Sequence, residues 1–278
     1  MRVLTEGWTF LESPRWRDGR FWVSDFYTGS IVAVALDGTA ETVARVAGQP
    51  SGLGWLPNGD LLVVSMRDRS VMRCAEGALS PYADLAGVAS GYANDMVVAA
   101  DGTAYVGNFG FDLMAGEPVR PATLARVAPD GSVYAAAGGL LFPNGMAIVA
   151  DGSALIVAET FAQRLTAFSI ASDGTLSGRR TWAQLERVSP DGIALDAEGC
   201  MWVADATHRR ALRVRPGGAI AEERTYEDAG IFACALGGPE GTTLALCVAP
   251  TFHEAAARAA RASRLVVCEV DVPRAGLP

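Results

Sequence analysis

Short apolar runs alternate with polar turns along the whole chain, and most of these turns end in glycine. One series of turns recurs every 40 to 50 residues, at Gly19, Gly59, Gly102, Gly152, Gly199 and Gly241. A second series falls between them, at Gly38, Gly77, Gly131, Gly174 and Gly218. Each turn separates two apolar runs, the pattern of a β-hairpin whose turn needs a residue tolerant of positive φ. Two hairpins in each period predict repeats of four antiparallel strands.

A repeat of this length with four strands is typical of the blades of a β-propeller. In the fourth repeat, for example, residues 154–158, 164–170 and 179–184 are expected to form the second to fourth strands. Six such repeats predict an all-β, six-bladed β-propeller of four-stranded antiparallel blades, with residues 1–278 in a single domain. Only residues 254–262, rich in Ala and Arg, are expected to be helical.

The sixth repeat is one strand short. It contains apolar runs at 232–237, 243–248 and 264–270, after which the chain nearly ends. The run at 2–8 precedes the first repeat and has no partner there. We therefore expect this N-terminal strand to complete the sixth blade, closing the ring and removing an open sheet edge.

Four repeats carry an oxygen-bearing polar residue six or seven positions before the acidic turn residue. These residues are Glu12, Asn94, Asn144 and Asp191. The first strand of each blade lines the channel of a propeller, so residues at the starts of these strands ring its mouth. Carboxylate and amide oxygens suit a hard divalent cation such as Ca²⁺, Mg²⁺, Mn²⁺ or Zn²⁺. Ser51 and Phe232 break the ring, and an alternative is that the polar residues only cap strand ends.

Antiparallel pairing brings the end of the second strand of each blade to the same mouth. The residues expected there are Asp25, Met66, Asn108, Glu159 and Asp205. The loops at 110–121 and 251–263, which follow two of these strands, are unusually long. Insertions on one face of a repeat protein usually mark its binding face. The sequence leaves open whether these loops act as a lid.

Composition limits the range of partners. The chain has 31 acidic and 23 basic residues and a net charge of −8, which disfavours binding to nucleic acid or to an anionic membrane. The N-terminus has no signal-peptide pattern, and five widely spaced cysteines show no C-x-x-C pair. These features predict a cytoplasmic protein that is a monomer or a small homo-oligomer.

Several phrases resemble the regucalcin/gluconolactonase/luciferin-regenerating enzyme family. They are Glu12-Ser13-Pro14-Arg15-Trp16, Asn94-Asp95-Met96, Pro143-Asn144-Gly145, Pro190-Asp191-Gly192-Ile193 and Met201-Trp202-Val203-Ala204. The resemblance implies a six-bladed propeller with one divalent metal ion, and many family members hydrolyse lactones. It also implies that Glu12, Asn144 and Asp191 bind the metal, with Asp191 as general base. Asn94 would lie beside the metal and contact water or substrate.

One departure from the family concerns the substrate. Sugar-lactone hydrolases resembling regucalcin carry Arg where this chain has Tyr92, and an acidic residue after the third blade's second strand. Here that segment reads Gly107-Asn108-Phe109-Gly110-Phe111-Asp112. We therefore expect Tyr92, Asn94, Asn108, Phe109 and Phe111 to contact a flatter, more apolar or aromatic lactone or ester. Further aromatic residues that could join this wall are Trp8, Phe26, Tyr27, Phe161 and Phe252.

The sequence thus predicts a carboxylic ester hydrolase that opens a small-molecule lactone by metal-activated water, with catalytic roles for Asp191 and Asn94. Asp205 is an alternative proton acceptor. Other functions remain open: a sugar-lactone hydrolase, a metal-containing binding propeller without catalysis, an esterase, or a condensing enzyme resembling strictosidine synthase. No G-x-S-x-G motif supports serine-hydrolase chemistry. His208 and His253, the only histidines, are expected to be exposed, although His253 could touch substrate.

Overall fold

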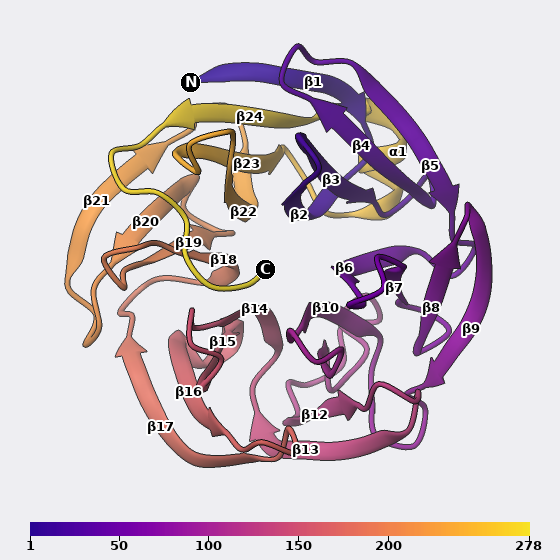
Figure 1. Cartoon of the computed structure of the whole chain (residues 1–278). Coiled ribbons are helices and arrows are strands. Elements are labelled where there is room, and N and C mark those ends of the chain that lie inside the picture. Colours follow the sequence, from indigo (N-terminus) through magenta and orange to yellow (C-terminus); the bar gives the residue numbers. More distant parts are fainter.

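The computed structural model describes all residues, 1–278, as six four-stranded antiparallel sheets around a central axis (Figure 1). This confirms the predicted six-bladed propeller. The first blade contains β2 (Leu11–Arg17), β3 (Arg20–Asp25), β4 (Ser30–Ala35) and β5 (Ala40–Arg45). The second contains β6 (Pro50–Trp55), β7 (Leu61–Ser65), β8 (Ser70–Ala75) and β9 (Ala78–Asp84). The third contains β10 (Ala93–Val98), β11 (Ala104–Asn108), β12 (Ala122–Val127) and β13 (Val133–Leu140).

The remaining blades follow the same order outward from the axis. The fourth contains β14 (Pro143–Ile148), β15 (Ala154–Glu159), β16 (Arg164–Ile170) and β17 (Leu176–Gln184). The fifth contains β18 (Pro190–Leu195), β19 (Met201–Asp205), β20 (Arg210–Val214) and β21 (Ile220–Thr225). The sixth contains β22 (Gly230–Gly237), β23 (Thr243–Ala249), β24 (Ser263–Glu269) and β1 (Arg2–Trp8).

The ring is closed by the N-terminal strand, as the sequence predicts. Strand β1 pairs antiparallel with β24, with Val3 opposite Val266, and becomes the outermost strand of the sixth blade (Figure 1). Two segments from opposite ends of the chain therefore share one sheet. This pairing covers an edge that would otherwise present unpaired backbone groups.

Helical structure is limited to two short segments. Helix α1 (Glu254–Ala260) ends two residues earlier than predicted, because Arg261 adopts a left-handed conformation with φ of 43° and its N–H bonds to the Ala257 carbonyl. A 3₁₀ turn, η1 (Thr160–Ala162), follows β15 and was not predicted. No helix of the structure is long and apolar enough to cross a membrane.

Apolar side chains from neighbouring blades interlock to form the core. Between the fourth and fifth blades, for instance, Ile156 and Leu165 pack with Ile193 and Val203 in one buried cluster. Similar clusters join the other blade pairs. Each blade thus buries the apolar residues of its inner strands against the next blade, which supplies the main driving force for ring formation.

The innermost strands approach one another closely at the axis. A Cβ atom at Gly145 would lie 2.5 Å from the backbone oxygen of Asp191, and one at Gly192 would lie 2.6 Å from the Cα of Ala233. Glycine at these positions therefore allows neighbouring β14, β18 and β22 to pack backbone against backbone. This is why the repeated phrase pairs a polar residue with glycine: the glycine contacts the next blade.

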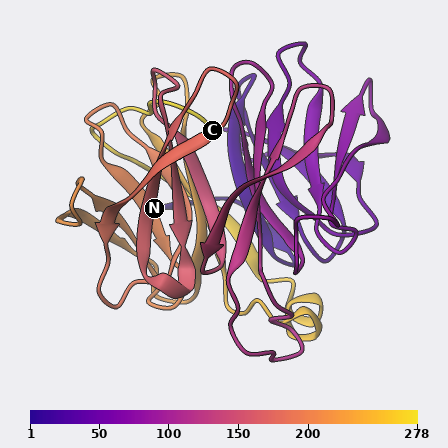
Figure 2. The same cartoon turned by 90° about the horizontal axis from the view of Figure 1, so that it is seen from below.

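The C-terminal segment covers one end of the channel. Leu277 exchanges backbone hydrogen bonds with Ile148, and Ala275 donates to the Leu195 carbonyl. These partners lie at the far ends of β14 and β18, away from Asn144 and Asp191. Figure 2 shows the C-terminus on one face of the ring and α1 projecting from the opposite face.

Candidate functional site

A cavity of about 560 Å³ occupies the mouth of the channel on the α1 face. Its lining includes Glu12, Asn94, Asn144 and Asp191, so the structure brings together the four polar residues that the repeat singled out. Each is the second residue of the innermost strand of its blade, β2, β10, β14 and β18. Strand pairing is irregular at or directly after this residue in all four strands. Such bulges redirect side chains, and here they accompany side chains that face the cavity.

The two carboxyl groups of this set lack a basic partner. Glu12 and Asp191 are both buried, and neither forms an ion pair with any Arg or His. Burial and the nearby charge of Asp95 raise the pKa of Glu12 to about 8. Burial, followed by the charges of Glu12 and Asp95, raises the pKa of Asp191 well above its usual value. Without a cation, the floor of the cavity therefore favours the neutral, protonated forms of these two carboxyl groups.

The nearest cation is already engaged. Arg15 lies beneath the floor, where its guanidinium contacts the Asp95 carboxylate at 2.6 Å and both side chains are buried. The same guanidinium donates to the Leu53 and Met96 carbonyls at 3.0 and 2.8 Å. The Ser13 hydroxyl also donates a hydrogen bond to the Asp95 carboxylate, at 3.0 Å. This network ties the first three inner strands together and leaves Glu12 and Asp191 unpaired.

The amides of the floor also have spare hydrogen-bonding capacity. The Nδ2 atom of Asn94 is buried and has no hydrogen-bond partner in the structure. Asn144 donates a long hydrogen bond, 3.3 Å, to the Thr160 hydroxyl, and its side chain also interacts with the Asp191 carboxylate. A buried polar group without a partner is costly, and a ligand in the cavity that accepts from Asn94 would remove this cost.

The chemistry of this donor set fits a hard divalent cation. Buried carboxylates that lack a basic partner are expected to bind a metal or to become neutral, and two carboxylates with two amides offer only oxygen to a metal. The chain has no cluster of three or more His, Cys, Asp or Glu residues in metal-binding geometry. Any metal site here therefore depends on the amide oxygens as well as on Glu12 and Asp191.

A second ring of residues lies two positions before the first and also lines the cavity. Its members are Phe10, Gln49, Tyr92, Phe142 and Ser189. Only Tyr92 was predicted. The signal for the others was present in the sequence, because each precedes its blade's polar position by the same two residues. Aromatic residues occupy this ring in the first, third and fourth blades, which makes that part of the wall apolar.

Aromatic side chains pack in two groups along the wall. Phe109 stacks on Phe142 with ring centroids 4.5 Å apart, and Tyr92 lies 6.1 Å from Phe109. In the second group, the ring centroids of Phe10 and Phe232 lie 4.9 Å apart. The predicted wall residues Phe26, Tyr27, Phe161 and Phe252 also line the cavity. Of the 24 lining residues, 13 are hydrophobic, so most of the wall suits an apolar ligand.

Three of the predicted contact residues do not line the cavity. Asn108 is buried, where its Nδ2 donates to the Thr123 carbonyl at 2.7 Å and its Oδ1 accepts from the Gly110 N–H at 3.1 Å. Its amide therefore stabilises the following loop instead of facing substrate. Phe111 packs behind Phe142 and Phe161, and Trp8 packs in the core between the first and sixth blades. Strand position alone does not determine which way a side chain faces, and the placement of these three residues does not favour their predicted contact with substrate.

The acidic residues at the ends of the second strands are likewise turned away from the cavity. Asp25 accepts hydrogen bonds from the backbone N–H groups of Thr9 and Phe10, and Glu159 accepts one from Leu141. Asp205 accepts one from Ser189 at 3.0 Å. In each blade the carboxylate thus holds the segment that enters the innermost strand. We call Asp25, Glu159 and Asp205 the anchoring carboxylates.

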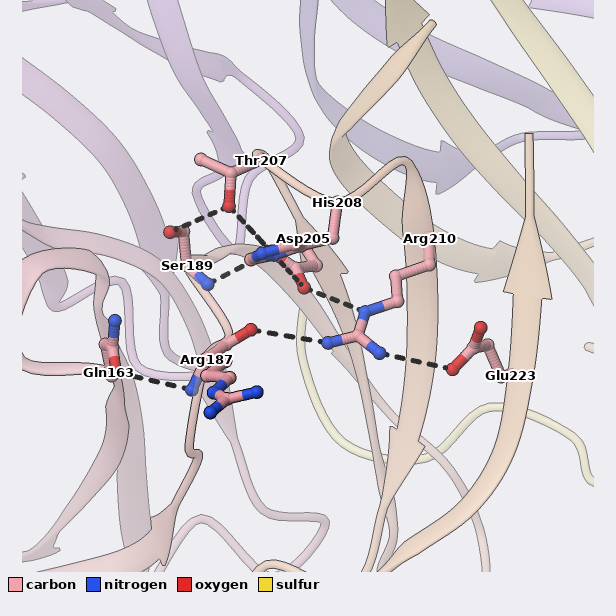
Figure 3. Close-up of polar contacts among 8 residues, drawn as sticks. All are labelled: Gln163, Arg187, Ser189, Asp205, Thr207, His208, Arg210 and Glu223. Carbon is pink, nitrogen blue, oxygen red and sulfur yellow. Dashed lines mark hydrogen bonds and ion pairs between the residues drawn. The ribbon is translucent and has the colours of Figure 1, made fainter. Parts of the chain in front are cut away.

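Asp205 shows why these residues are poor candidates for a general base. Arg210 donates to it at 2.9 Å, and the His208 ring contacts it at 2.9 Å (Figure 3). Burial alone would raise the pKa of Asp205, but hydrogen bonds from His208, Ser189 and Arg210 lower it below the usual value. Both oxygens are engaged and the residue does not line the cavity. The structure therefore favours Asp191 over Asp205 as the proton acceptor.

The two long loops flank the cavity mouth. Leu113 and Met114 from the 110–121 loop, and Phe252 and His253 from the 251–263 loop, are among its lining residues. Glu254 at the start of α1 forms an ion pair with Arg67 of the second blade at 2.6 Å. This contact links the long loop of the sixth blade to the second blade.

Comparison with known proteins identifies the family. Residues 10–249 match the family described as SMP-30/Gluconolactonase/LRE-like region. The chain belongs to this family. A stretch of 124 residues is 29% identical to 6-deoxy-6-sulfogluconolactonase of Pseudomonas putida, and one of 126 residues is 31% identical to regucalcin of Danio rerio. Each match covers 44% of this chain and less than half of the relative, 43% and 42% respectively.

Solved structures of the same family share the fold. Regucalcin of Agrobacterium tumefaciens, described as a calcium-binding protein, matches 100% of this chain and 96% of its own with a TM-score of 0.84 at 19% identity. A luciferin-regenerating enzyme matches 98% and 95% with a TM-score of 0.82 at 17% identity. At these identities the likeness shows the fold alone. Membership of the SMP-30/gluconolactonase family supports lactone hydrolysis at the level of the family.

Proposed function

We propose that this protein is a divalent-metal-dependent hydrolase that opens a lactone or a related cyclic ester. The observation that carries the proposal is the pair of buried carboxylates, Glu12 and Asp191, which lack a basic partner at the floor of a 560 Å³ cavity. Buried charges of this kind are retained when they bind a cation or perform chemistry. The family's lactone-hydrolysing members support the same reaction class.

Glu12, Asn144 and Asp191 are the residues that would hold the metal ion. When bound, a divalent cation polarises the ester carbonyl and lowers the pKa of a water molecule at the site. The floor residues provide only oxygen donors, which admits Ca²⁺, Mg²⁺, Mn²⁺ or Zn²⁺. A bound cation would also favour the ionised forms of Glu12 and Asp191, whose pKa values burial raises.

The roles of the chain's own groups follow from their positions. Asp191 would accept a proton from the attacking water at a carboxylate oxygen as the new C–O bond to the carbonyl carbon forms. The unpartnered Nδ2 of Asn94 would donate to the oxygen on which negative charge develops. The ring C–O bond then breaks, and its oxygen takes the proton held by Asp191 and leaves as the hydroxyl of the hydroxy acid, which regenerates the Asp191 carboxylate. The aromatic wall would exclude bulk water from this floor.

The wall favours a substrate that is more apolar or aromatic than a sugar lactone. Tyr92, Phe109 and Phe142 present ring faces and edges on one side of the floor, and Phe10 and Phe232 do so on the other. A planar ester could lie between these two groups. Polyhydroxylated substrates need many polar partners, and the cavity wall near the third and fourth blades offers few.

A second candidate is a sugar-lactone hydrolase. A curated relative of this chain is named as a hydrolase of a sulfonated gluconolactone, and hydroxyl groups of Ser189 and Thr207 line the cavity on the fifth blade. The two substrate classes would use the same floor. They differ in whether the aromatic wall or the hydroxyl-bearing wall dominates binding.

A panel of lactones tests the proposal. Acid release from dihydrocoumarin, δ-valerolactone and glucono-1,5-lactone would be followed with a pH indicator, in EDTA and after re-addition of each divalent metal. We expect turnover to vanish in EDTA and to return with metal, and dihydrocoumarin to exceed gluconolactone at least about tenfold in kcat/KM. The reverse preference would favour the sugar-lactone reading. Metal binding without turnover of any lactone would leave a binding propeller.

A further inference from the structure

A second, smaller hollow of about 300 Å³ adjoins the cavity between the fifth and sixth blades. It shares five lining residues with the main cavity: Ala206, Thr207, Phe232, Phe252 and His253. The remaining walls come from Arg209, Gly230 and residues 249–251. We call this space the lateral groove. A ligand on the cavity floor could extend into it past Thr207 and Phe232.

The lateral groove is lined by a basic residue, whereas the floor is lined by acidic ones. Arg209 is its only permanently charged lining residue, and no acidic residue lines it. The Arg209 guanidinium donates to the Glu227 backbone carbonyl at 2.8 Å and forms no ion pair with a carboxylate. Glu227 and Asp228 follow on an exposed loop and do not line the groove. The positive charge of Arg209 is therefore available to a ligand.

The buried anion of the same turn, Asp205, forms no ion pair with Arg209. It is bound by Arg210 and His208 instead (Figure 3). Of the two hydroxyl groups of the groove, that of Thr207 is already engaged with Ser189, Asp205 and His208. Thr251 Oγ1 accepts from the His253 N–H at 3.1 Å, so its own proton is free to be donated. One cation with an adjacent neutral donor and no acid is the arrangement expected for a carboxylate.

The backbone of the propeller does not require an arginine at this position. Arg209 has φ of 56° and directly precedes β20, and the equivalent residues of the first, second and fourth blades are Gly29, Arg69 and Gln163. All four carbonyls accept the N–H of the residue that follows the blade's outermost strand, at 2.7 to 2.9 Å. Glycine or glutamine makes this contact as well as arginine. Of the two arginines, only Arg209 lines a space that joins the cavity.

We propose that the lateral groove is a subsite in which Arg209 binds a carboxylate carried by the substrate, while the ester to be cleaved lies over Glu12 and Asp191. The substrate would then combine a neutral ring, held by the aromatic wall, with an acidic substituent on the side that faces the fifth and sixth blades. The assignment of the ester rests on the proposed function. Anion binding by Arg209 does not, so the two can fail separately.

Binding of 3-phenylpropionate and of uncharged 3-phenylpropionamide, measured by titration calorimetry on the purified full-length protein, tests the subsite. We expect the acid to bind about tenfold more tightly than the amide, because a charged acceptor strengthens the hydrogen bonds of Arg209. Arg209→Gln should remove this preference, and Arg209→Lys should retain part of it. Arg69→Gln is the matched control, since it makes the same change at the equivalent position of the second blade and should leave the preference intact.

The kinetic arm uses a γ-butyrolactone that carries a carboxylate at the γ-position and its carboxamide. We expect Arg209→Gln to raise KM for the carboxylate about tenfold without changing kcat, and to leave the carboxamide unaffected. If Arg209→Gln binds 3-phenylpropionate as tightly as the wild type, the subsite is wrong, whatever the turnover. Arg209-dependent binding without turnover of either lactone would overturn the hydrolase proposal and keep the subsite.

Discussion

Two sets of acidic residues lie within the same face of the ring and have opposite surroundings. Glu12 and Asp191 on the innermost strands face the cavity, lack basic partners and have raised pKa values. Glu159 and Asp205, two of the anchoring carboxylates on the second strands, are fully hydrogen-bonded and have lowered pKa values. Both sets are buried, so burial alone does not separate them. Their partners do.

The difference separates the groups that hold the ring together from those that are free for chemistry. Each anchoring carboxylate accepts the N–H of the segment entering its own blade and, in the fourth and fifth blades, binds arginine as well. Such groups stabilise the fold. The floor carboxylates contribute no comparable interaction in the metal-free protein, so their presence points to ligand binding. Four predictions test this division, beginning with the largest expected effect.

Replacing a floor carboxylate should abolish turnover and spare the fold. We expect Asp191→Asn to lower kcat for a cleaved lactone by about 10³-fold or more, because it removes both the proton acceptor and a charged oxygen donor. The melting temperature in EDTA should not fall, since Asp191 has no ion pair to lose. Steady-state kinetics and calorimetric melting check this. A large loss of stability with retained kcat would contradict the division.

Replacing an anchoring carboxylate should have the opposite result. Glu159 pairs with Arg164 at 2.8 Å and Arg179 at 3.4 Å and accepts the Leu141 N–H at 2.9 Å. We expect Glu159→Gln to lower the free energy of unfolding by about 2 kcal/mol, discounted because both arginines are about one-third exposed. Urea unfolding measures this loss. The kcat per folded molecule should remain close to that of the wild type.

Metal should stabilise the protein through the floor alone. After EDTA treatment, a divalent cation at about 100 times its Kd is expected to stabilise the wild type by about 2.7 kcal/mol, a rise in melting temperature on the order of 5 °C. Glu12→Gln should lose most of this rise, whereas Glu159→Gln should keep it. Differential scanning calorimetry with and without metal makes the comparison. Equal shifts in both variants would place the metal elsewhere.

Lowering the pH should destabilise the fold by protonating the anchoring carboxylates. Burial raises the pKa of Glu159, but hydrogen bonds from Arg164, Thr166 and Leu141 lower it below its usual 4.5. The stability contributed by a lowered pKa is fully present above the unfolded-state value and is lost as the pH falls through the folded-state value. We therefore expect the urea midpoint to fall when the pH is lowered from 6 to 3.5, and to fall less in Glu159→Gln. An equal fall in the variant would mean that other carboxylates control acid stability.

Much of the fold could be predicted because its signals are local and repeated. Turn glycines recur at a regular interval, and the unpaired run at Arg2–Trp8 matched a blade that lacked a strand. The shared register of Glu12, Asn94, Asn144 and Asp191 was enough to place them around one axis, since equivalent positions of a closed repeat must meet there. The same register would have identified the ring that contains Phe10 and Phe142.

The tertiary structure decided which polar residues lack hydrogen-bonding partners and that the lateral groove adjoins the cavity. Asp191 and Asp205 are both aspartates at strand ends on the same face, yet only Asp205 has Arg210 and His208 within hydrogen-bonding distance. Asn108 is the last residue of the expected strand, but its amide bonds to a backbone carbonyl instead of facing the cavity. Phe111 follows the same strand and packs against Phe142 outside the cavity lining. The sequence by itself thus determined the ring and its floor, because repetition places equivalent residues together. Partners, side-chain direction and the groove beside Arg209 arise from contacts between segments far apart in the chain, and only the folded structure specifies them.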